Sequence, residues 1–265
     1  MAGMNENLHL IELLSADISH IDSPDAILLR DVNWRIQQGE FWVVGGRAAS
    51  GKSSLLLTAA GLNRPAGGAL RIFGEDLAQA KEKDQITWRH RIGFVFESGG
   101  RPFHRLSVAE NIGLPLRYHW AMSEASIAAR VDELLTLTDL RAYAQDLPGR
   151  VNLAVQQRAA LARALTTTDG STSSPKLLFA DNPLSALSLR DCRWWLDFLR
   201  QLRESYLSGG ETMTIIASAN DFRAWADVAT HFAAIENGRF IIVGGRDQLA
   251  SSTDSIVREL LAAGT

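Results

Sequence analysis

The sequence Phe41-Trp-Val-Val-Gly-Gly-Arg-Ala-Ala-Ser-Gly-Lys-Ser-Ser54 contains the pattern G-x-x-x-x-G-K-[ST], which runs from Gly46 to Ser53. An apolar run over residues 41–44 precedes the pattern, and a run of helical character over residues 53–60 follows it. This order predicts a strand, a tight glycine-rich loop and a helix. Gly46 and Gly51 permit the tight turn and a close approach of the backbone to a ligand.

The loop has the chemistry expected of a binding site for a triphosphate. Its backbone N–H groups are expected to point at the anion from a helix N-terminus, where the helix dipole favours negative charge. Lys52 is expected to reach the β- and γ-phosphates, and the Ser53 hydroxyl is expected to bind Mg²⁺. The alternative is a glycine-rich turn with a surface lysine. The predicted ATP-binding residues are Gly46, Arg47, Ala48, Ala49, Ser50, Gly51, Lys52, Ser53 and Ser54.

Composition limits the class of protein. The chain has 265 residues, of which 46% are hydrophobic, enough for one domain with a large core. The net charge of −3 and the pI of about 6.1 do not support a nucleic-acid partner or an anionic membrane surface bound through bulk charge. The single cysteine, Cys192, excludes an internal disulfide, and no apolar run approaches the roughly 18 residues of a membrane span. A cytoplasmic protein is therefore expected.

Apolar periodicity along the rest of the chain predicts strands that alternate with helices. The predicted strands cover residues 8–14, 27–36, 69–73, 91–96, 177–180 and 212–217. Helical patterns cover residues 108–112, 123–136, 156–165 and 191–206, while 84–90 suits a short surface segment and 166–175 a polar loop. Residues 232–243, interrupted by Asn237-Gly238, predict a hairpin. Together these segments predict an α/β fold with a mainly parallel sheet.

A nucleotide site built on such a loop also needs an acidic residue for Mg²⁺ at the end of another strand. The run Pro175-Lys-Leu-Leu-Phe-Ala-Asp181 provides one, because Asp181 directly follows an apolar strand. We therefore predict that Asp181 faces the phosphates. The alternative role for this residue is a helix N-cap at the end of the strand.

Several further segments, in the same order along the chain, make it resemble the nucleotide-binding subunit of an ABC transporter. The similar segments are 92–96 to the strand before the Q-loop, 156–165 to the helix after the signature, 177–187 to Walker B and the D-loop, 214–221 to the H-loop strand, and 234–239 to the closing hairpin. The resemblance covers nearly the whole chain. It implies a P-loop NTPase (RecA-like) core with an antiparallel β subdomain and an inserted helical subdomain. All of these belong to one ATP-binding domain, residues 1–265, with 97–165 as the helical and signature part.

The chain departs from the family pattern at the residues that the family uses for chemistry. The catalytic Glu after the Walker B Asp is Asn182, whose amide cannot accept a proton, and the switch His is Asn220. The Q-loop Gln is Glu97, which the resemblance places among the Mg²⁺ ligands with Ser53 and Asp181. None of these catalytic positions is intact. Glu97 is an alternative candidate for a replacement base, from a different loop.

The ABC signature Leu-Ser-Gly-Gly-Gln is also altered. Two glycines that let the backbone approach the opposing γ-phosphate are replaced by Leu153 and Ala154, while Asn152 can still cap the helix that follows. The aligned residues are Val151, Asn152, Leu153, Ala154 and Val155.

Three further positions differ from the family. The D-loop Asp is Ser188, and a glycine usual in the phosphate loop is Ala49. The aromatic residue that stacks on adenine has no evident equivalent upstream of the loop. His20 is the nearest candidate, and a solvated surface histidine is the alternative.

Lys52, Ser53 and Asp181 are kept, so the subunit is predicted to bind ATP and Mg²⁺. Because the catalytic positions are altered, it is predicted to hydrolyse ATP weakly or not at all. In the family, each ATP lies between the phosphate loop (Walker A) of one chain and the signature sequence of another. The resemblance therefore implies a second nucleotide-binding subunit, in a homodimer or heterodimer, and an integral membrane permease. It also implies that this chain is cytoplasmic and peripheral on the inner face of the cell membrane. The alternative is a soluble ABC-type scaffold or regulatory protein without a permease.

Two sequence segments give an indication of the transported substrate. Residues 107–117 and 255–261 resemble the ATPases of Mce/Mla-type lipid transport across a bacterial envelope. Amino-acid importers and lipoprotein-release ATPases share part of the first segment. A further alternative is that both segments are amphipathic helices common to the fold and carry no information on the substrate. The sequence leaves the substrate and the direction of transport open, because the permease mainly sets the substrate.

Overall fold

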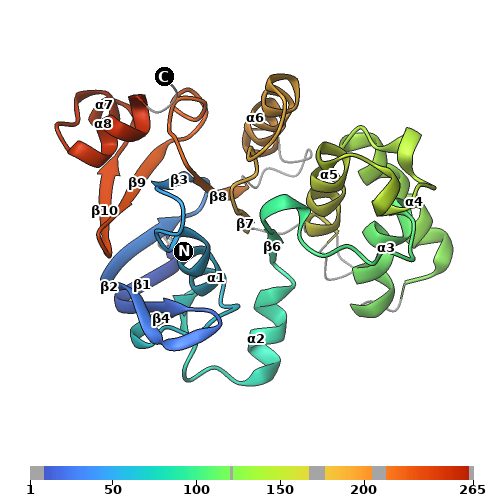
Figure 1. Cartoon of the computed structure of the whole chain (residues 1–265). Helices are drawn as coiled ribbons and strands as arrows, with labels where there is room; N and C mark the ends of the chain where they lie inside the picture. Colours follow the sequence, from blue (N-terminus) through green and yellow to red (C-terminus); the bar gives the residue numbers. More distant parts are fainter. Residues whose placement is uncertain (1–8, 120–121, 167–176, 205–212, 263–265) are drawn as a thin grey trace, which may run out of the picture. The chain divides into compact units, whose positions relative to one another are not determined.

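The computed structural model describes residues 9–119, 122–166, 177–204 and 213–262 (Figure 1). They form two compact units: the first contains the described residues up to Arg89 and from Leu196 onward, and the second spans His90–Trp195. Parts of some predicted segments lie outside the described residues. These parts are residue 8, most of the predicted polar loop at 166–175, and residues 205–206 and 212. The assignment of 1–265 to one domain, with 97–165 as its helical part, stays a prediction.

The first unit contains a four-stranded antiparallel sheet with the strand order β2-β1-β4-β5. Its strands are β1 (His9–His20), β2 (Ser23–Gln37), β4 (Gly67–Ile72) and β5 (Glu75–Asp76). β1 and β2 extend beyond the predicted runs at 8–14 and 27–36, because the two strands stay paired through several register shifts as far as His20 and Ser23. This sheet is the antiparallel β subdomain that the resemblance implied.

Parallel strands of the same unit carry the phosphate loop. β3 (Phe41–Gly46) lies between β8 (Thr214–Ala219) and β9 (His231–Glu236) and is parallel to both. Every residue of β3 and β8 is buried, which explains their continuous apolar runs. β9 turns at Asn237-Gly238 into the antiparallel strand β10 (Arg239–Gly244), so the predicted hairpin is confirmed.

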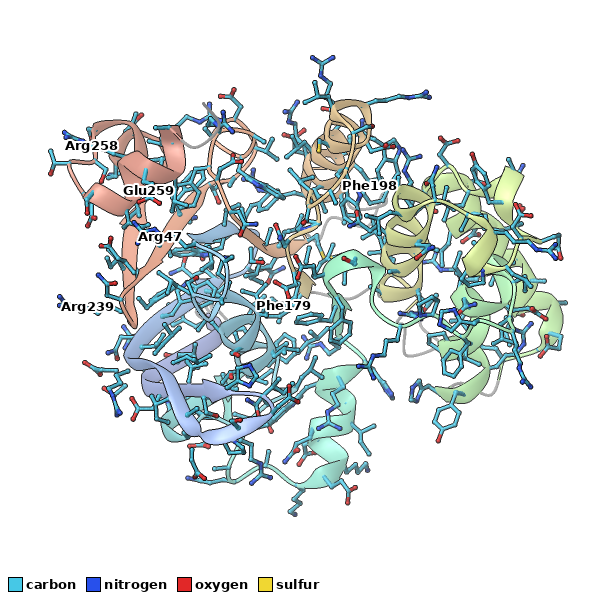
Figure 2. The ribbon with its side chains drawn as sticks, in the orientation of Figure 1. Arg47, Phe179, Phe198, Arg239, Arg258 and Glu259 are labelled. Carbon is cyan, nitrogen blue, oxygen red and sulfur yellow. The ribbon has the colours of Figure 1, made fainter. Side chains whose placement is uncertain are left out.

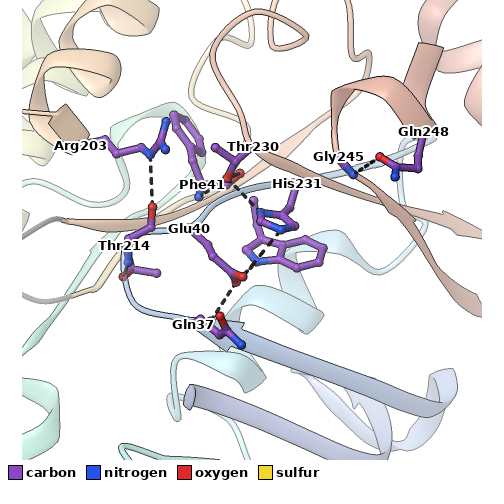
Figure 3. Close-up of polar contacts among 11 residues, drawn as sticks. Gln37, Glu40, Phe41, Arg203, Thr214, Thr230, His231, Gly245 and Gln248 are labelled. Atoms are coloured by element: carbon purple, nitrogen blue, oxygen red, sulfur yellow. Dashed lines mark hydrogen bonds and ion pairs between the residues drawn. The ribbon is translucent and has the colours of Figure 1, made fainter. Parts of the chain in front are cut away.

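Hydrogen bonds fix the point where the chain enters β3 (Figure 3). The Thr230 hydroxyl accepts from the backbone N–H of Phe41 at 2.8 Å. The Glu40 carboxylate accepts from the backbone N–H of Gln37 at 2.8 Å and from the indole N–H of Trp42 at 2.7 Å. Because these bonds satisfy donors at the start of the strand, they favour a single register for the strand that leads to the phosphate loop.

The helices of the first unit include two, α2 and α7, that were not predicted from the sequence. The described helices are α1 (Lys52–Ala59), α2 (Glu82–Arg89), α7 (Arg246–Ser251) and α8 (Ser255–Ala262). α2 occupies most of the stretch at 84–90 that was expected to be a short surface segment. Glu82 and Asp84 lie in its first turn and Arg89 in its last, as the helix dipole favours, and Trp88 is buried.

The second unit combines two parallel strands with several helices. β6 (Ile92–Val95) pairs with β7 (Leu177–Ala180), so that Val95 lies opposite Ala180. The helical elements are η1 (Glu97–Gly99), α3 (Val108–His119), α4 (Glu124–Leu137), η2 (Arg141–Tyr143), η3 (Pro148–Arg150) and α5 (Leu153–Ala164). Helix α6 (Leu189–Glu204) contributes residues to both units. The predicted helices at 123–136 and 156–165 are confirmed as α4 and α5.

Helix α3 is longer than the predicted segment at 108–112. It begins with a reciprocal cap in which Glu110 Oε2 accepts from the N–H of Ser107 at 2.7 Å and Ser107 Oγ accepts from the N–H of Glu110 at 3.2 Å. The hydrogen bonds from Ser107 lower the pKa of Glu110. The helix then continues through Pro115 to His119.

Candidate nucleotide-binding site

The phosphate loop joins the buried strand β3 to helix α1, as the sequence predicted. The N-cap residue of α1 is Gly51, whose φ of 102° is a left-handed conformation that glycine adopts without a steric penalty. Among the described residues, no side chain caps this helix, and its first turn contains no acidic residue. The N–H groups at the start of α1 are therefore suited to an anionic ligand.

Lys52 and Ser50 place polar groups inside the loop. Lys52 is buried, and its Nζ donates to the carbonyl oxygens of Gly46 at 2.6 Å and Arg47 at 2.7 Å. Ser50 Oγ is buried without a hydrogen-bond partner within the described part of the chain. A cationic donor and an unpaired hydroxyl in one loop fit the oxygen-rich chemistry of a triphosphate.

Ala49 holds a conformation that favours glycine. Its φ is 58°, in the left-handed region, at a position where the family usually has glycine. A side chain with a Cβ atom costs roughly 1 kcal/mol in this region relative to glycine. The replacement is therefore a source of local strain in the loop.

Replacing Ala49 by Gly is expected to raise the free energy of unfolding by about 1 kcal/mol, because it removes the left-handed strain. Urea denaturation of the two proteins measures the difference. The matched control is Ala48→Gly, at a neighbouring position outside the left-handed set, where the added backbone entropy of the unfolded chain should destabilise the protein. An equal effect of the two substitutions would contradict the prediction.

Arg47 connects the loop to the C-terminal helix α8. Its Nε donates to Glu259 Oε1 at 2.8 Å and its Nη2 donates to Oε2, so that the pair is bidentate (Figure 2). The hydrogen bond and charge of Glu259 raise the pKa of Arg47, and the same hydrogen bond lowers the pKa of Glu259. Both side chains are about half exposed, so the pair orients Arg47 more than it stabilises the fold.

Asn220, at the switch position, follows strand β8 in the first unit. Ala219 lies opposite Gly45 in the parallel pairing of β8 with β3, so Asn220 comes beside the first residue of the phosphate loop. Asn220 is exposed. The chain is then tied to α8, because the N–H of Phe222 donates to the carbonyl oxygen of Leu260 at 2.9 Å.

The second unit holds the predicted acidic positions. The N–H of Asp181 donates to the carbonyl oxygen of Val95 at 2.8 Å, which continues the pairing of β7 with β6. Asp181 is buried, and Asn182 follows it with a φ of 46°. Asn182 Nδ2 donates to Glu97 Oε1 at 2.7 Å. The structure therefore brings Glu97 and Asn182 into contact directly after the Walker B strand.

The altered signature leads into helix α5. Asn152 is the N-cap of this helix, and its Oδ1 accepts from the N–H of Val155 at 3.0 Å, so the predicted capping role is confirmed. Leu153 and Ala154 form the first helical residues, and both are partly exposed. Val151 precedes the cap in an extended conformation.

A polar network around Arg158 was missed by the sequence analysis. Ser188, at the D-loop position, donates its hydroxyl to Asp191 Oδ2 at 2.6 Å. The other Asp191 oxygen accepts from Arg158 on α5 at 3.0 Å, and the Arg158 guanidinium also lies 4.1 Å from the ring centre of Trp194. Arg158 is nearly buried and pairs with Asp139 as well. The D-loop position is thus connected to the signature helix, and only the S-x-x-D spacing at 188–191 could have indicated part of it.

The predicted residues thus fall into two groups. The first unit holds residues 46–54 and Asn220, and the second holds Glu97, Asp181, Asn182 and the signature residues 151–155. The exposed Ser53 hydroxyl and the carboxylates of Asp181 and Glu97 are oxygen donors of the kind that Mg²⁺ prefers. His20, the candidate for adenine stacking, is exposed at the end of β1, where its Nδ1 accepts from the N–H of Asp22 at 3.2 Å.

A buried parallel strand, a glycine-rich loop and a helix that begins at Lys52 define a P-loop nucleotide-binding protein of the α/β class. The chain belongs to the ABC transporter family, whose sequence profile matches residues 29–185.

Curated relatives are import ATP-binding proteins. Methionine import ATP-binding protein MetN 2 of Paraburkholderia xenovorans is 32% identical over 82% of this chain, and the chain spans about half (53%) of that relative. MetN of Campylobacter jejuni is 28% identical over 89% of this chain and 71% of its own length. A probable sulfate/thiosulfate import ATP-binding protein CysA of Chlorella vulgaris is 30% identical over 87% of this chain and 90% of its own.

Solved structures agree with the fold. A dimeric post-hydrolysis state of the ATP-binding cassette MJ0796, bound to ADP and Pi, gives a TM-score of 0.74 at 25% identity and covers 86% of this chain and 95% of its own. CbiO1 of Clostridium perfringens, part of the ABC transporter complex cbiONQ, gives a TM-score of 0.77 at 20% identity over 95% of this chain and 94% of its own. In the described part of the chain, no helix combines the length and apolar character that crossing a bilayer requires.

Proposed function

We propose that this chain is the ATP-binding subunit of an ABC transporter that holds Mg-ATP and hydrolyses it slowly or not at all. The observation that carries the proposal is the intact phosphate loop around Lys52 in a chain with Asn182 after the Walker B strand. Ser53, Asp181 and Glu97 are the proposed Mg²⁺ ligands. Bound Mg²⁺ would neutralise phosphate charge, and these three residues would hold the ion in place.

The expected loss of rate follows from the missing groups. Loss of a water-activating carboxylate commonly removes 10²- to 10⁴-fold of the rate, which is about 3–5 kcal/mol of barrier. The Asn220 amide at the switch position carries no charge, and the signature lacks both of its glycines. These losses are expected to lower the rate further, although the separate effects on the barrier do not sum.

The same pattern bears on the partner nucleotide-binding subunit. In a homodimer, both ATP sites combine an altered Walker B position with an altered signature. In a heterodimer, one site carries Asn182 and the other faces Leu153 and Ala154. Every pairing therefore weakens both sites, and we propose that bound ATP mainly holds the assembly together. Native mass measurement of the complex distinguishes the symmetric from the asymmetric pair.

We propose that the second unit docks on a membrane permease at the cytoplasmic face. Phe96 and Phe103 are exposed in the segment that follows β6, with 43% and 56% of their surfaces accessible. A small pocket lined in part by Pro102, Val108 and Val151 lies in the same unit. Exposed aromatic side chains in this segment support a protein-docking role.

For the cargo, we propose lipid or envelope transport, on the resemblance of residues 107–117 and 255–261. Import of a small solute is the second candidate, which the methionine and sulfate import names of the relatives favour. Purification of the native complex identifies the permease and its bound cargo together. A complex without any polytopic membrane protein would favour a soluble scaffold instead.

Equilibrium binding and single-turnover hydrolysis test the core of the proposal. We expect the purified protein to bind ATP with Mg²⁺ and to release phosphate at least 100-fold more slowly than an ordinary member of the family. A rate comparable to ordinary members would overturn the hydrolysis part. Absence of ATP binding in equilibrium dialysis would overturn the whole proposal.

A further inference from the structure

A pocket of about 500 Å³ adjoins the phosphate loop within the first unit. It lies between strand β2 and the turn that joins β9 to β10, and β2 and β10 are side by side in Figure 1. Leu28, on the pocket wall, packs against the loop, because a Cβ atom at Gly51 would lie 3.4 Å from Leu28 Cβ. At the start of the loop, Gly46 pairs with Ile235, two residues before Asn237, which also lines the pocket. The pocket is therefore within reach of a ligand whose phosphates occupy the loop.

Part of the pocket wall is apolar and suited to a flat ligand. Phe240 on β10 lines the pocket with a partly exposed ring, and its ring centre lies 5.2 Å from that of the fully buried Trp34. Contact with Trp34 therefore holds the Phe240 ring against the core. Ile27 and Leu28, both partly exposed, add aliphatic surface from β2. An aromatic ring in such a position is a platform on which a nucleobase stacks. The aromatic residue that has no equivalent upstream of the loop thus has a candidate downstream of it.

The turn between β9 and β10 supplies hydrogen-bonding groups. The backbone N–H of Arg30 donates to the carbonyl oxygen of Gly238 at 3.3 Å, which fixes the turn against β2. Asn237 is exposed, and its side-chain amide has no hydrogen-bond partner within the described part of the chain. An amide offers a donor and an acceptor side by side, which complements N7 and the N6 amino group of adenine. Arg239, at the same turn (Figure 2), has no ion-pair partner among the described residues and adds positive charge that favours a polyphosphate.

We propose that this pocket holds the adenine base of the nucleotide whose phosphates bind the loop. Phe240 and Leu28 contact the ring system of the base, and the Asn237 amide accepts from the N6 amino group and donates to N7. Guanine presents acceptors at both O6 and N7, so the same amide bonds only one of them, and ATP is preferred over GTP. The inference rests on the proposed function, because it names the base-binding part of the same nucleotide site.

Equilibrium dialysis with ATP, GTP and inorganic tripolyphosphate tests this assignment, because tripolyphosphate occupies the loop without a base. Phe240→Ala is expected to weaken ATP binding by about 10- to 100-fold through loss of stacking. Asn237→Gly keeps a residue suited to the left-handed turn and should weaken ATP binding by about 10-fold, with loss of the preference for ATP over GTP. Both substitutions should leave tripolyphosphate affinity unchanged. Ile242→Ala, at an exposed position of the same strand outside the pocket, is the matched control and should change nothing.

Two further measurements keep the outcomes distinct. Thermal unfolding checks that each substituted chain is folded. In the unsubstituted protein, the Asn237 side-chain amide resonances should shift with ATP and stay in place with tripolyphosphate. Unchanged ATP affinity in Phe240→Ala and Asn237→Gly, or equal losses of affinity for ATP and tripolyphosphate, would overturn this inference and leave the proposed function standing. Failure of the unsubstituted chain to bind ATP would overturn both.

Discussion

Replacing Lys52 by Ala is expected to weaken ATP binding by 100- to 1,000-fold, or about 3–4 kcal/mol. The ammonium is the one side-chain cation that the loop pattern directs at the β- and γ-phosphates. In the described structure it already lies inside the loop, bonded to the carbonyl oxygens of Gly46 and Arg47. Charge-assisted hydrogen bonds are roughly twice as strong as neutral ones, and an alanine side chain forms no hydrogen bond in their place.

Equilibrium dialysis with ATP, ADP and AMP measures this effect. AMP has no β- or γ-phosphate, so its weaker affinity should change little, whereas ATP affinity should fall steeply. Thermal unfolding of the substituted chain checks that the loop itself still folds, and Arg47→Ala serves as the control cation. Because Arg47 is bonded to Glu259 on α8, its removal should affect ATP far less. A similar loss for the two substitutions would show that bulk charge, rather than loop geometry, holds the nucleotide.

The fold was largely predictable because its decisive signals are local. The strand, loop and helix around Lys52 are encoded within residues 41–60, and the strand before Asp181 within residues 177–180. Family resemblance then supplied the antiparallel sheet and the helical part, which no short pattern specifies. Helix α2 was missed because its apolar side chains are few and only Trp88 is buried.

The contacts of the site were less predictable, because they join residues far apart in sequence. The pairing of β6 with β7 decides that Glu97 meets Asn182, and a shift of one residue would have separated them. The ion pair of Arg47 with Glu259 spans 212 positions and has no local signature. Burial of Arg158 likewise depends on how α5 and α6 approach each other.

Gly45 is a further residue that the sequence analysis did not single out, and the structure gives it a strict steric role. Replacing Gly45 by Ala is expected to lower the free energy of unfolding by about 2–3 kcal/mol. A Cβ atom there would lie 2.4 Å from two ring carbons of Phe222 and 2.8 Å from Leu260 Cδ1. Phe222 is fully buried and Leu260 nearly so, so neither has an easy route of retreat.

Urea denaturation measures this loss, and Gly149→Ala is its matched control. A Cβ atom at Gly149 meets nothing within 4 Å, so that substitution should change stability by less than about 0.5 kcal/mol. Combining Gly45→Ala with Phe222→Leu should recover part of the loss, because the smaller side chain leaves room for the methyl group. Since Gly45 directly precedes the phosphate loop and Phe222 follows the switch residue Asn220, the single substitution should also weaken ATP binding. Additive effects of Gly45→Ala and Phe222→Leu would contradict the steric explanation.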